Sequence, residues 1–234
     1  RRVLNVATIK KSDTMLPYSG TGTITGGVGA TTLSGVNGTT MLLHCTSKRA
    51  TLADLGGPGF PADKTTRTSN EVFWVGTKEK IDIQTTTSLP WQWRRIVFTA
   101  KGLEPISFTV DSETTTATDH LLTSNGYVRY TARLGGDTTN SALAATVASY
   151  IFKGSGGEDW LTPINAPISR DRVSIWYDKT IDIRSGNDVG TRRTYNRWHP
   201  IRKTLVYQDL EAGGRENTKD NSSLSNRSVG DVYL

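Results

Sequence analysis

The chain has 234 residues, a formal net charge of +6 and a pI near 9.5, although only 21% of its residues are charged. Because the basic excess reflects few acids, it favours an anionic partner without indicating a lysine-rich tail. A single cysteine, Cys45, excludes an intrachain disulfide. No apolar run reaches the roughly 20 residues of a membrane-spanning helix, and no secretory signal opens the chain. We expect a soluble protein made in a reducing compartment.

The first third of the chain predicts few strands and long loops. Residues 3–14 alternate apolar and polar side chains and predict a strand, whereas residues 17–38 are rich in Gly, Ser and Thr and predict a loop. A short apolar strand is expected at 39–46, with the Cys45 thiol buried inside the protein. The Gly-Pro cluster at 56–61 excludes regular structure there.

Further strands are predicted in the middle of the chain by alternation and by turn residues. They cover 72–83, as one bent strand or a pair, 90–98, 106–110 and 127–134, the last following an Asn-Gly turn. Between residues 140 and 153, apolar side chains recur at spacings of three and four after a capping residue. This pattern predicts the only helix.

The last third predicts two more strands, at 173–183 and 203–209, joined by an Arg-rich link at 192–199 and followed by a polar, turn-rich segment at 212–227. Eight or more strands, long loops and no internal repeat are typical of an all-β jelly-roll sandwich, here a single domain over 1–234. An immunoglobulin-like sandwich is the alternative, but the chain lacks its cysteine pair and exceeds its length.

The residues that usually carry catalysis are scattered. The three histidines, His44, His120 and His199, do not lie at metal-ligand spacing from one another or from clustered acids. Asp119 beside His120 is more typical of a solvated loop than of a catalytic pair. We interpret His199 as a turn residue bonded to backbone; a pH-sensitive subunit contact is the alternative. We therefore expect neither an enzyme nor a cofactor.

Six tryptophans and several pairs of cations carry more information. We expect Trp74 and Trp93 to fill the space between two sheets, while a tryptophan beside arginine also serves base stacking and protein interfaces. One cation pair is typical of a charged strand edge. Several together favour a surface that contacts phosphates.

Five stretches of the sequence resemble the capsid proteins of genomoviruses and, more distantly, geminivirus coat proteins. They are 2–5 with 10–16, 91–95, 177–187, 198–207 and 230–233. The resemblance implies a jelly-roll subunit that assembles, in about 60 copies, into a T=1 icosahedral shell around circular single-stranded DNA. It also implies a virion protein assembled in the host nucleus, without a membrane, with a basic arm before the first residue and a further strand after the last.

If one face of such a subunit meets the genome, paired cations should line it. We predict DNA contacts from Arg1, Arg2, Lys10, Lys11, Lys48, Arg49, Arg192, Arg193, Arg202 and Lys203. A carbohydrate-binding jelly roll is the alternative function, because exposed tryptophans and Asp/Asn-rich loops would serve it. A cupin-type enzyme ranks last, since its His and Glu cluster is missing.

Overall fold

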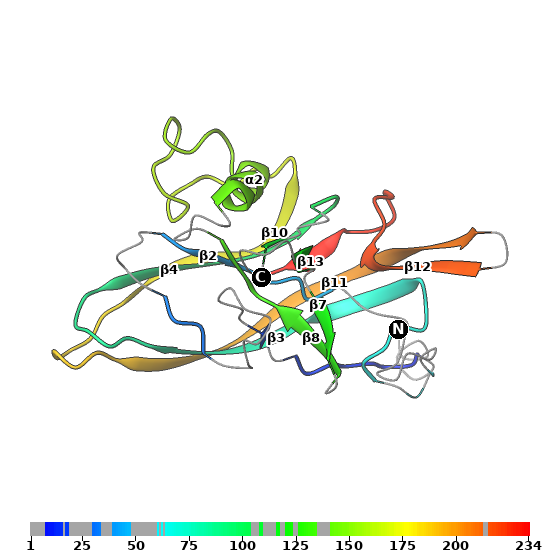
Figure 1. Ribbon diagram of the computed structural model, residues 1–234, viewed down its shortest axis with the longest axis horizontal. Coiled ribbons are helices and arrows are strands. Elements are labelled where there is room, and N and C mark those ends of the chain that lie inside the picture. Colours follow the sequence, from blue (N-terminus) through cyan, green and yellow to red (C-terminus); the bar gives the residue numbers. More distant parts are fainter. Residues whose placement is uncertain are drawn as a thin grey trace.

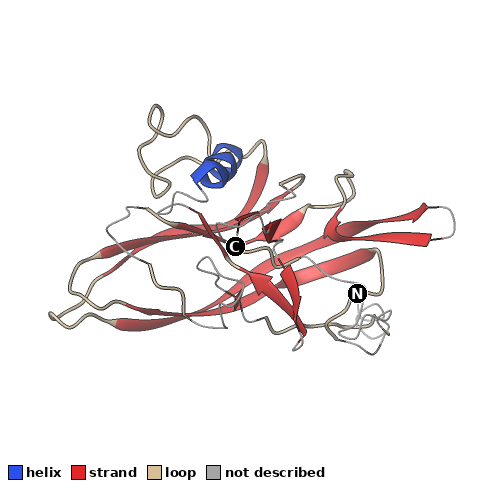
Figure 2. Cartoon of the chain, viewed as in Figure 1, coloured by secondary structure: helices blue, strands red, loops and turns tan. Residues whose placement is uncertain are grey.

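The structure is a computed structural model, and it describes residues 8–15, 17–18, 30–33, 39–47, 60, 62, 64–103, 108–109, 116–117, 120–123, 126–134, 141–212 and 215–234. This part of the chain is mostly β-strand with one short helix (Figure 2). None of its helices has the length and apolar character needed to cross a membrane. The elements are β1 Pro17–Tyr18, β2 Met41–Leu43, β3 Glu71–Gln84, β4 Trp91–Ala100, β5 Phe108–Thr109, β6 Thr116–Ala117, β7 His120–Thr123, β8 Gly126–Tyr130, β9 Ala132–Leu134, α2 Ser141–Ile151, β10 Val173–Ile183, β11 Arg192–Ala212, β12 Arg215–Ser222 and β13 Asp231–Tyr233.

Two antiparallel sheets form the body of the protein. One has the strand order β10-β4-β13 and the other the order β12-β11-β3. Helix α2 lies on the far side of the first sheet, so that helix, sheet and sheet are stacked in that order (Figure 1). The expected all-β sandwich with one short helix is confirmed at this level.

The long strands pair in a nested way. Strand β3 pairs with β11 in one sheet, and the strands that follow β3 and precede β11, namely β4 and β10, pair in the other. Both connections, 85–90 and 184–191, therefore pass between the sheets at the same end (Figure 1). Strand β13 pairs with the free edge of β4. On its other side the backbone NH groups of His44 and Thr46 donate to the carbonyls of Leu234, at 3.1 Å, and Val232, at 2.9 Å.

Alternation along β4 explains why both faces of its sheet are covered. Phe98 and Ala100 belong to the core cluster beneath helix α2, whereas Val97 belongs to the cluster between the two sheets. Side chains two apart in a strand share a face, so one strand supplies both cores. The helix-side core comprises Leu43, Cys45, Phe98, Ala100, Leu103, Leu134, Val147, Ala148, Ile151, Phe152, Ala166, Val173 and Tyr233. The core between the sheets comprises Val97, Ile201, Leu205, Tyr207, Val232 and Leu234.

Cys45 is buried as a free thiol in the helix-side core, as the sequence predicted. The strand around it is not buried throughout, however, because Leu42 keeps 37% of its surface exposed. Leu43 and Cys45 belong to the core, while His44 and Thr46, on the same face as Leu42, are buried as well.

Four sequence predictions of local structure were wrong. Of the strand predicted at 3–14, residues 3–7 lie outside the described part and 8–14 form no strand, and the predicted loop at 17–38 begins with β1. The link at 192–199 is the first part of β11, and the polar segment after 212 contains β12. Strands pair through backbone groups, so the polar side chains of β12 do not prevent its pairing with β11 from Tyr207 to Ala212. A polar composition alone therefore did not identify a loop.

Hydrogen bonds clip together the two connections that cross between the sheets. The Thr85 NH donates to the Thr191 carbonyl at 2.9 Å, and the Thr191 NH donates to Thr85 Oγ1 at 2.9 Å. Gly190 has a φ of +89°, and a methyl group there would collide with the Thr85 carbonyl. Only glycine fits this close approach.

Replacing Gly190 with alanine should therefore destabilise the protein by about 2 kcal/mol or more, since strained backbone and steric overlap add. Gly186 is the matched control in the same connection, because it has open space around its Cβ position. Gly186→Ala should change the free energy of unfolding by less than about 0.5 kcal/mol. Denaturant unfolding followed by tryptophan fluorescence measures both. Equal effects of the two substitutions would contradict the clip.

Candidate assembly and nucleic-acid surfaces

The structure brings only some of the predicted DNA-contacting cations together. Arg1, Arg2, Lys48 and Arg49 lie outside the described residues. Of the remaining six, Lys10 and Lys11 precede the sandwich, while two pairs lie on β11: Arg192 with Arg193, and Arg202 with Lys203. Ten residues of strand separate these two pairs by about 30 Å. They form two sites and not one patch.

Two of these cations already have protein partners. Lys11 Nζ donates to the Thr66 carbonyl at 2.9 Å and is half-buried. Arg192 Nε donates to Asp82 Oδ2 at 2.9 Å, and a second guanidinium nitrogen also bonds this oxygen. The hydrogen bond between Arg192 and Asp82 lowers the pKa of Asp82 and raises the pKa of Arg192. Both cations thus serve structure first.

The other pair on β11 lies at a β-bulge. The register with β3 shifts between Pro200 and Lys203, and Arg202 adopts a φ of +52°. A bulge inserts an extra residue and re-aims side chains, and both Arg202 and Lys203 are exposed here. Arg193 and Lys10 are exposed as well. These four cations are the described ones best placed to meet phosphates.

A buried charged cluster lies between the two sheets, and the sequence did not predict it. Glu79 on β3 bonds to Arg95 on β4 of the opposite sheet, and its Oε1 lies 2.8 Å from His199 Nε2 on β11. The Glu79 and His199 side chains are 8% and 2% exposed. Burial raises the pKa of Glu79, but the hydrogen bonds and charges of His199 and Arg95 outweigh it and hold that pKa at about 2. His199 is thus a buried strand residue bonded to a carboxylate, and the turn interpretation was wrong.

Aromatic rings extend this cluster. The guanidinium carbon of Arg197 lies 4.8 Å from the ring centroid of Trp93, 5.2 Å from that of Tyr177 and 5.4 Å from that of Tyr195. Trp93 also meets Tyr195 edge to face at 5.1 Å. Trp74 packs against the core between the sheets. Both tryptophans lie between the sheets, as the sequence predicted. Trp74 contributes packing, and Trp93 contributes packing and a cation–π contact.

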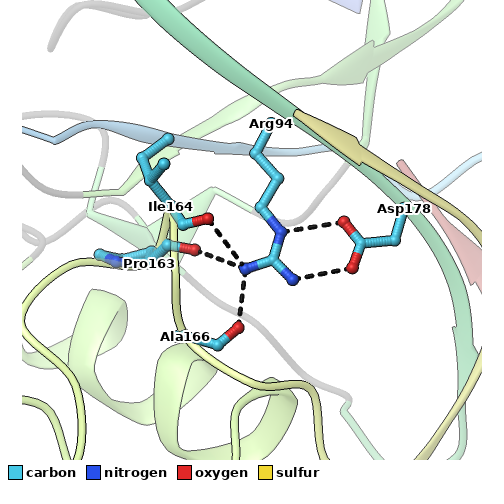
Figure 3. A network of polar contacts seen from close by, with 5 residues as sticks. All are labelled: Arg94, Pro163, Ile164, Ala166 and Asp178. Carbon is cyan, nitrogen blue, oxygen red and sulfur yellow. Dashed lines mark hydrogen bonds and ion pairs between the residues drawn. The ribbon is translucent and has the colours of Figure 1, made fainter. Parts of the chain in front are cut away.

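Arg94 and Arg95, read from sequence as one pair, serve opposite faces of β4. Arg94 forms a two-pronged pair with Asp178, Nε to Oδ1 at 2.9 Å and Nη2 to Oδ2 at 2.8 Å. Its Nη1 donates to three backbone carbonyls of the segment after α2 (Figure 3), those of Pro163, Ile164 and Ala166 at 2.9, 3.3 and 2.7 Å. A guanidinium that is fully engaged in this way anchors a loop.

The outer face of the β3–β11 pair carries exposed apolar side chains. Phe73, Val75 and Trp198 are 61%, 57% and 51% exposed. A methyl group at Gly76 would lie 2.7 Å from Trp198 Cζ2, so the indole covers that glycine and is held against the sheet. The sequence contained the signal for this surface: if Val72 and Trp74 face the core, Phe73 and Val75 must face away.

No family of known proteins, no curated protein and no solved structure matches the chain. Within the described ranges, no three His, Cys, Asp or Glu side chains lie close enough to hold a metal ion together. Asp119 lies outside those ranges, and of His120 only the backbone is described. Among the described residues, the features that the geometry brings together are therefore surfaces.

Replacing Glu79 with glutamine should destabilise the protein by about 3–5 kcal/mol, because it leaves the Arg95 charge buried without its partner. Glu71→Gln is the matched control on the same strand: Glu71 pairs with Arg227 at the surface, where an ion pair contributes only about 0–1 kcal/mol.

The same pair of variants tests the pH dependence. The pKa of Glu79 is about 2 in the folded state against an ordinary 4.5, so its stabilisation is present above pH 4.5 and declines as the pH falls toward 2. Unfolding curves across this range should show a steeper loss for the control variant than for Glu79→Gln. Parallel pH profiles would contradict the role of the cluster.

Proposed function

We propose that this chain is the capsid subunit of a small virus, a jelly roll that assembles into a T=1 icosahedral shell around circular single-stranded DNA. Sequence resemblance to genomovirus capsid proteins over five separate stretches supports the proposal. Two of those stretches, 91–95 and 177–187, fall on the paired strands β4 and β10 and on the connection that follows β10. They thus belong to one structural unit.

The strand pairing supports the jelly-roll part of the proposal. A jelly roll results when a long antiparallel hairpin rolls up, so that successive strand pairs alternate between two sheets. Here the pair β3–β11 lies in one sheet and the next pair, β4–β10, lies in the other. Strand β13 lies between β4 and residues 44–46, as the last strand of such a roll would.

Fold alone does not choose between a shell subunit and a lectin, because jelly rolls serve both. The observation that favours the shell is the exposed apolar face formed by Phe73, Val75 and Trp198 on the β3–β11 pair. Exposed apolar patches of this kind are typical of protein interfaces. A glycan site would instead require polar groups converging in a hollow.

The purified protein should form closed particles of uniform size. Analytical ultracentrifugation and negative-stain microscopy across salt, pH and added single-stranded DNA measure this directly. A chain that stays monomeric under all of these conditions is not a shell subunit. If it also binds to a glycan array, the lectin alternative holds.

DNA binding should be electrostatic and tolerant of sequence. For single strands, log K falls with log salt at a slope of about −0.7 per neutralised phosphate. Alanine at Arg193, Arg202 and Lys203 should make that slope shallower by about 2, because these three cations are exposed and form no ion pair with the described residues. Alanine at Arg192 is the control and should change it less, because Asp82 already binds that guanidinium. The reverse order would contradict this assignment.

A further inference from the structure

The outer face of the β3–β11 pair has an excess of positive charge around its apolar centre. Lys78 lies opposite Trp198 in the strand register, and Lys80 lies opposite Asn196. Both lysines are exposed. The acids at the two ends of β3 are already neutralised, Glu71 by Arg227 and Asp82 by Arg192. This face therefore fits a partner that is apolar and negatively charged.

The opposite character is found at the end of the sandwich where the two connections cross. Val189 and Leu89 are 80% and 67% exposed there, one on each connection. Asp188, next to Val189, is also exposed. This tip, defined by residues 85–90 and 184–191, offers an apolar surface with Asp188 beside it, while its one cation, Arg184, pairs with Asp182 at 3.4 Å.

The tip is held in shape by its own hydrogen bonds. Ser185 Oγ donates to the Gly190 carbonyl at 2.9 Å, and the Val189 NH donates to Asn187 Oδ1 at 3.3 Å. The clip between Thr85 and Thr191 fixes the base of the tip. A preorganised loop loses little conformational entropy on binding, which favours its use as a contact.

We propose that the tip of one copy of this chain docks on the outer β3–β11 face of a second copy. Val189 lies against Phe73, Val75 and Trp198, and Asp188 faces Lys78 and Lys80. The inference rests on the proposed shell function and names its contact. Because tip and face are different patches, the contact is heterologous, and repeating it builds a ring where the rotation closes. Such a ring would surround one symmetry axis of the proposed shell. Asp188 on the tip is complementary in charge to Lys78 and Lys80 on the face, and both patches belong to this chain. A second copy is therefore favoured over nucleic acid as the partner of the face.

Engineered cysteines test the contact directly. Cys45 is the only cysteine and is buried, so Val75→Cys with Val189→Cys introduces the only exposed thiols. Mild oxidation of assembled protein should give a ladder of disulfide-linked chains on a non-reducing gel. Val75→Cys with Leu161→Cys is the matched control: Leu161 is exposed on the segment between α2 and β10. Helix α2 lies across the first sheet from the β3–β11 pair (Figure 1). A ladder in the control alone overturns the proposal.

Charge reversal provides a second, independent readout. Lys78→Glu with Lys80→Glu should raise the protein concentration needed for assembly by about 10-fold or more, since it faces like charges against Asp188. Adding Asp188→Lys should restore most of that loss, while circular dichroism verifies the fold of every variant.

The outcomes separate the inference from the proposed function. If the double lysine variant assembles like the wild type, or loses single-stranded oligonucleotide binding without losing assembly, the docking surface is wrong and the shell function stands. If the wild-type chain never assembles, the function itself fails, and the docking inference fails with it.

Discussion

The structure depends on a carboxylate, Glu79, buried between two sheets. Its partners come from both sides: Arg95 from the opposite sheet and His199 from the neighbouring strand. A buried charge without partners costs more than a buried pair contributes, so the three strands β3, β4 and β11 must keep one relative position. A slip of one residue in any of the three strands would turn the group on that strand to the wrong face. The cluster thus sets the register of the sandwich more than it adds to its stability.

Two separate hydrophobic cores lie on the two faces of the sheet that contains β4. Helix α2 packs on one face of the β10–β4–β13 sheet, and β11 packs on the other. The consecutive residues Arg94 and Arg95 also point to opposite faces. Arg94 binds the segment after the helix, and Arg95 binds Glu79 of the second sheet. Strand β4 is therefore the element to which every layer is attached.

Among the described residues, exposed apolar side chains mark the far side of the second sheet. Its outer face keeps Phe73, Val75 and Trp198 in solvent, and Trp198 also shields Gly76. Such a surface is unfavourable for an isolated subunit and useful for one that is covered by neighbours. The proposed self-assembly would cover this face.

Sequence by itself determined the elements whose pattern is local. Helix α2 and strand β10 lie within or at the predicted limits, because a helical or alternating period is written in neighbouring residues. Burial of Cys45, and the packing of the half-buried Trp74 and Trp93 between the sheets, followed from the same apolar pattern. Only the tertiary structure decided which charges meet. Glu79 and His199 are 120 residues apart in the chain, Arg192 and Asp82 are 110 apart, and the pairing that joins them depends on how strands cross between sheets. That crossing is set by long-range packing, which no local period encodes.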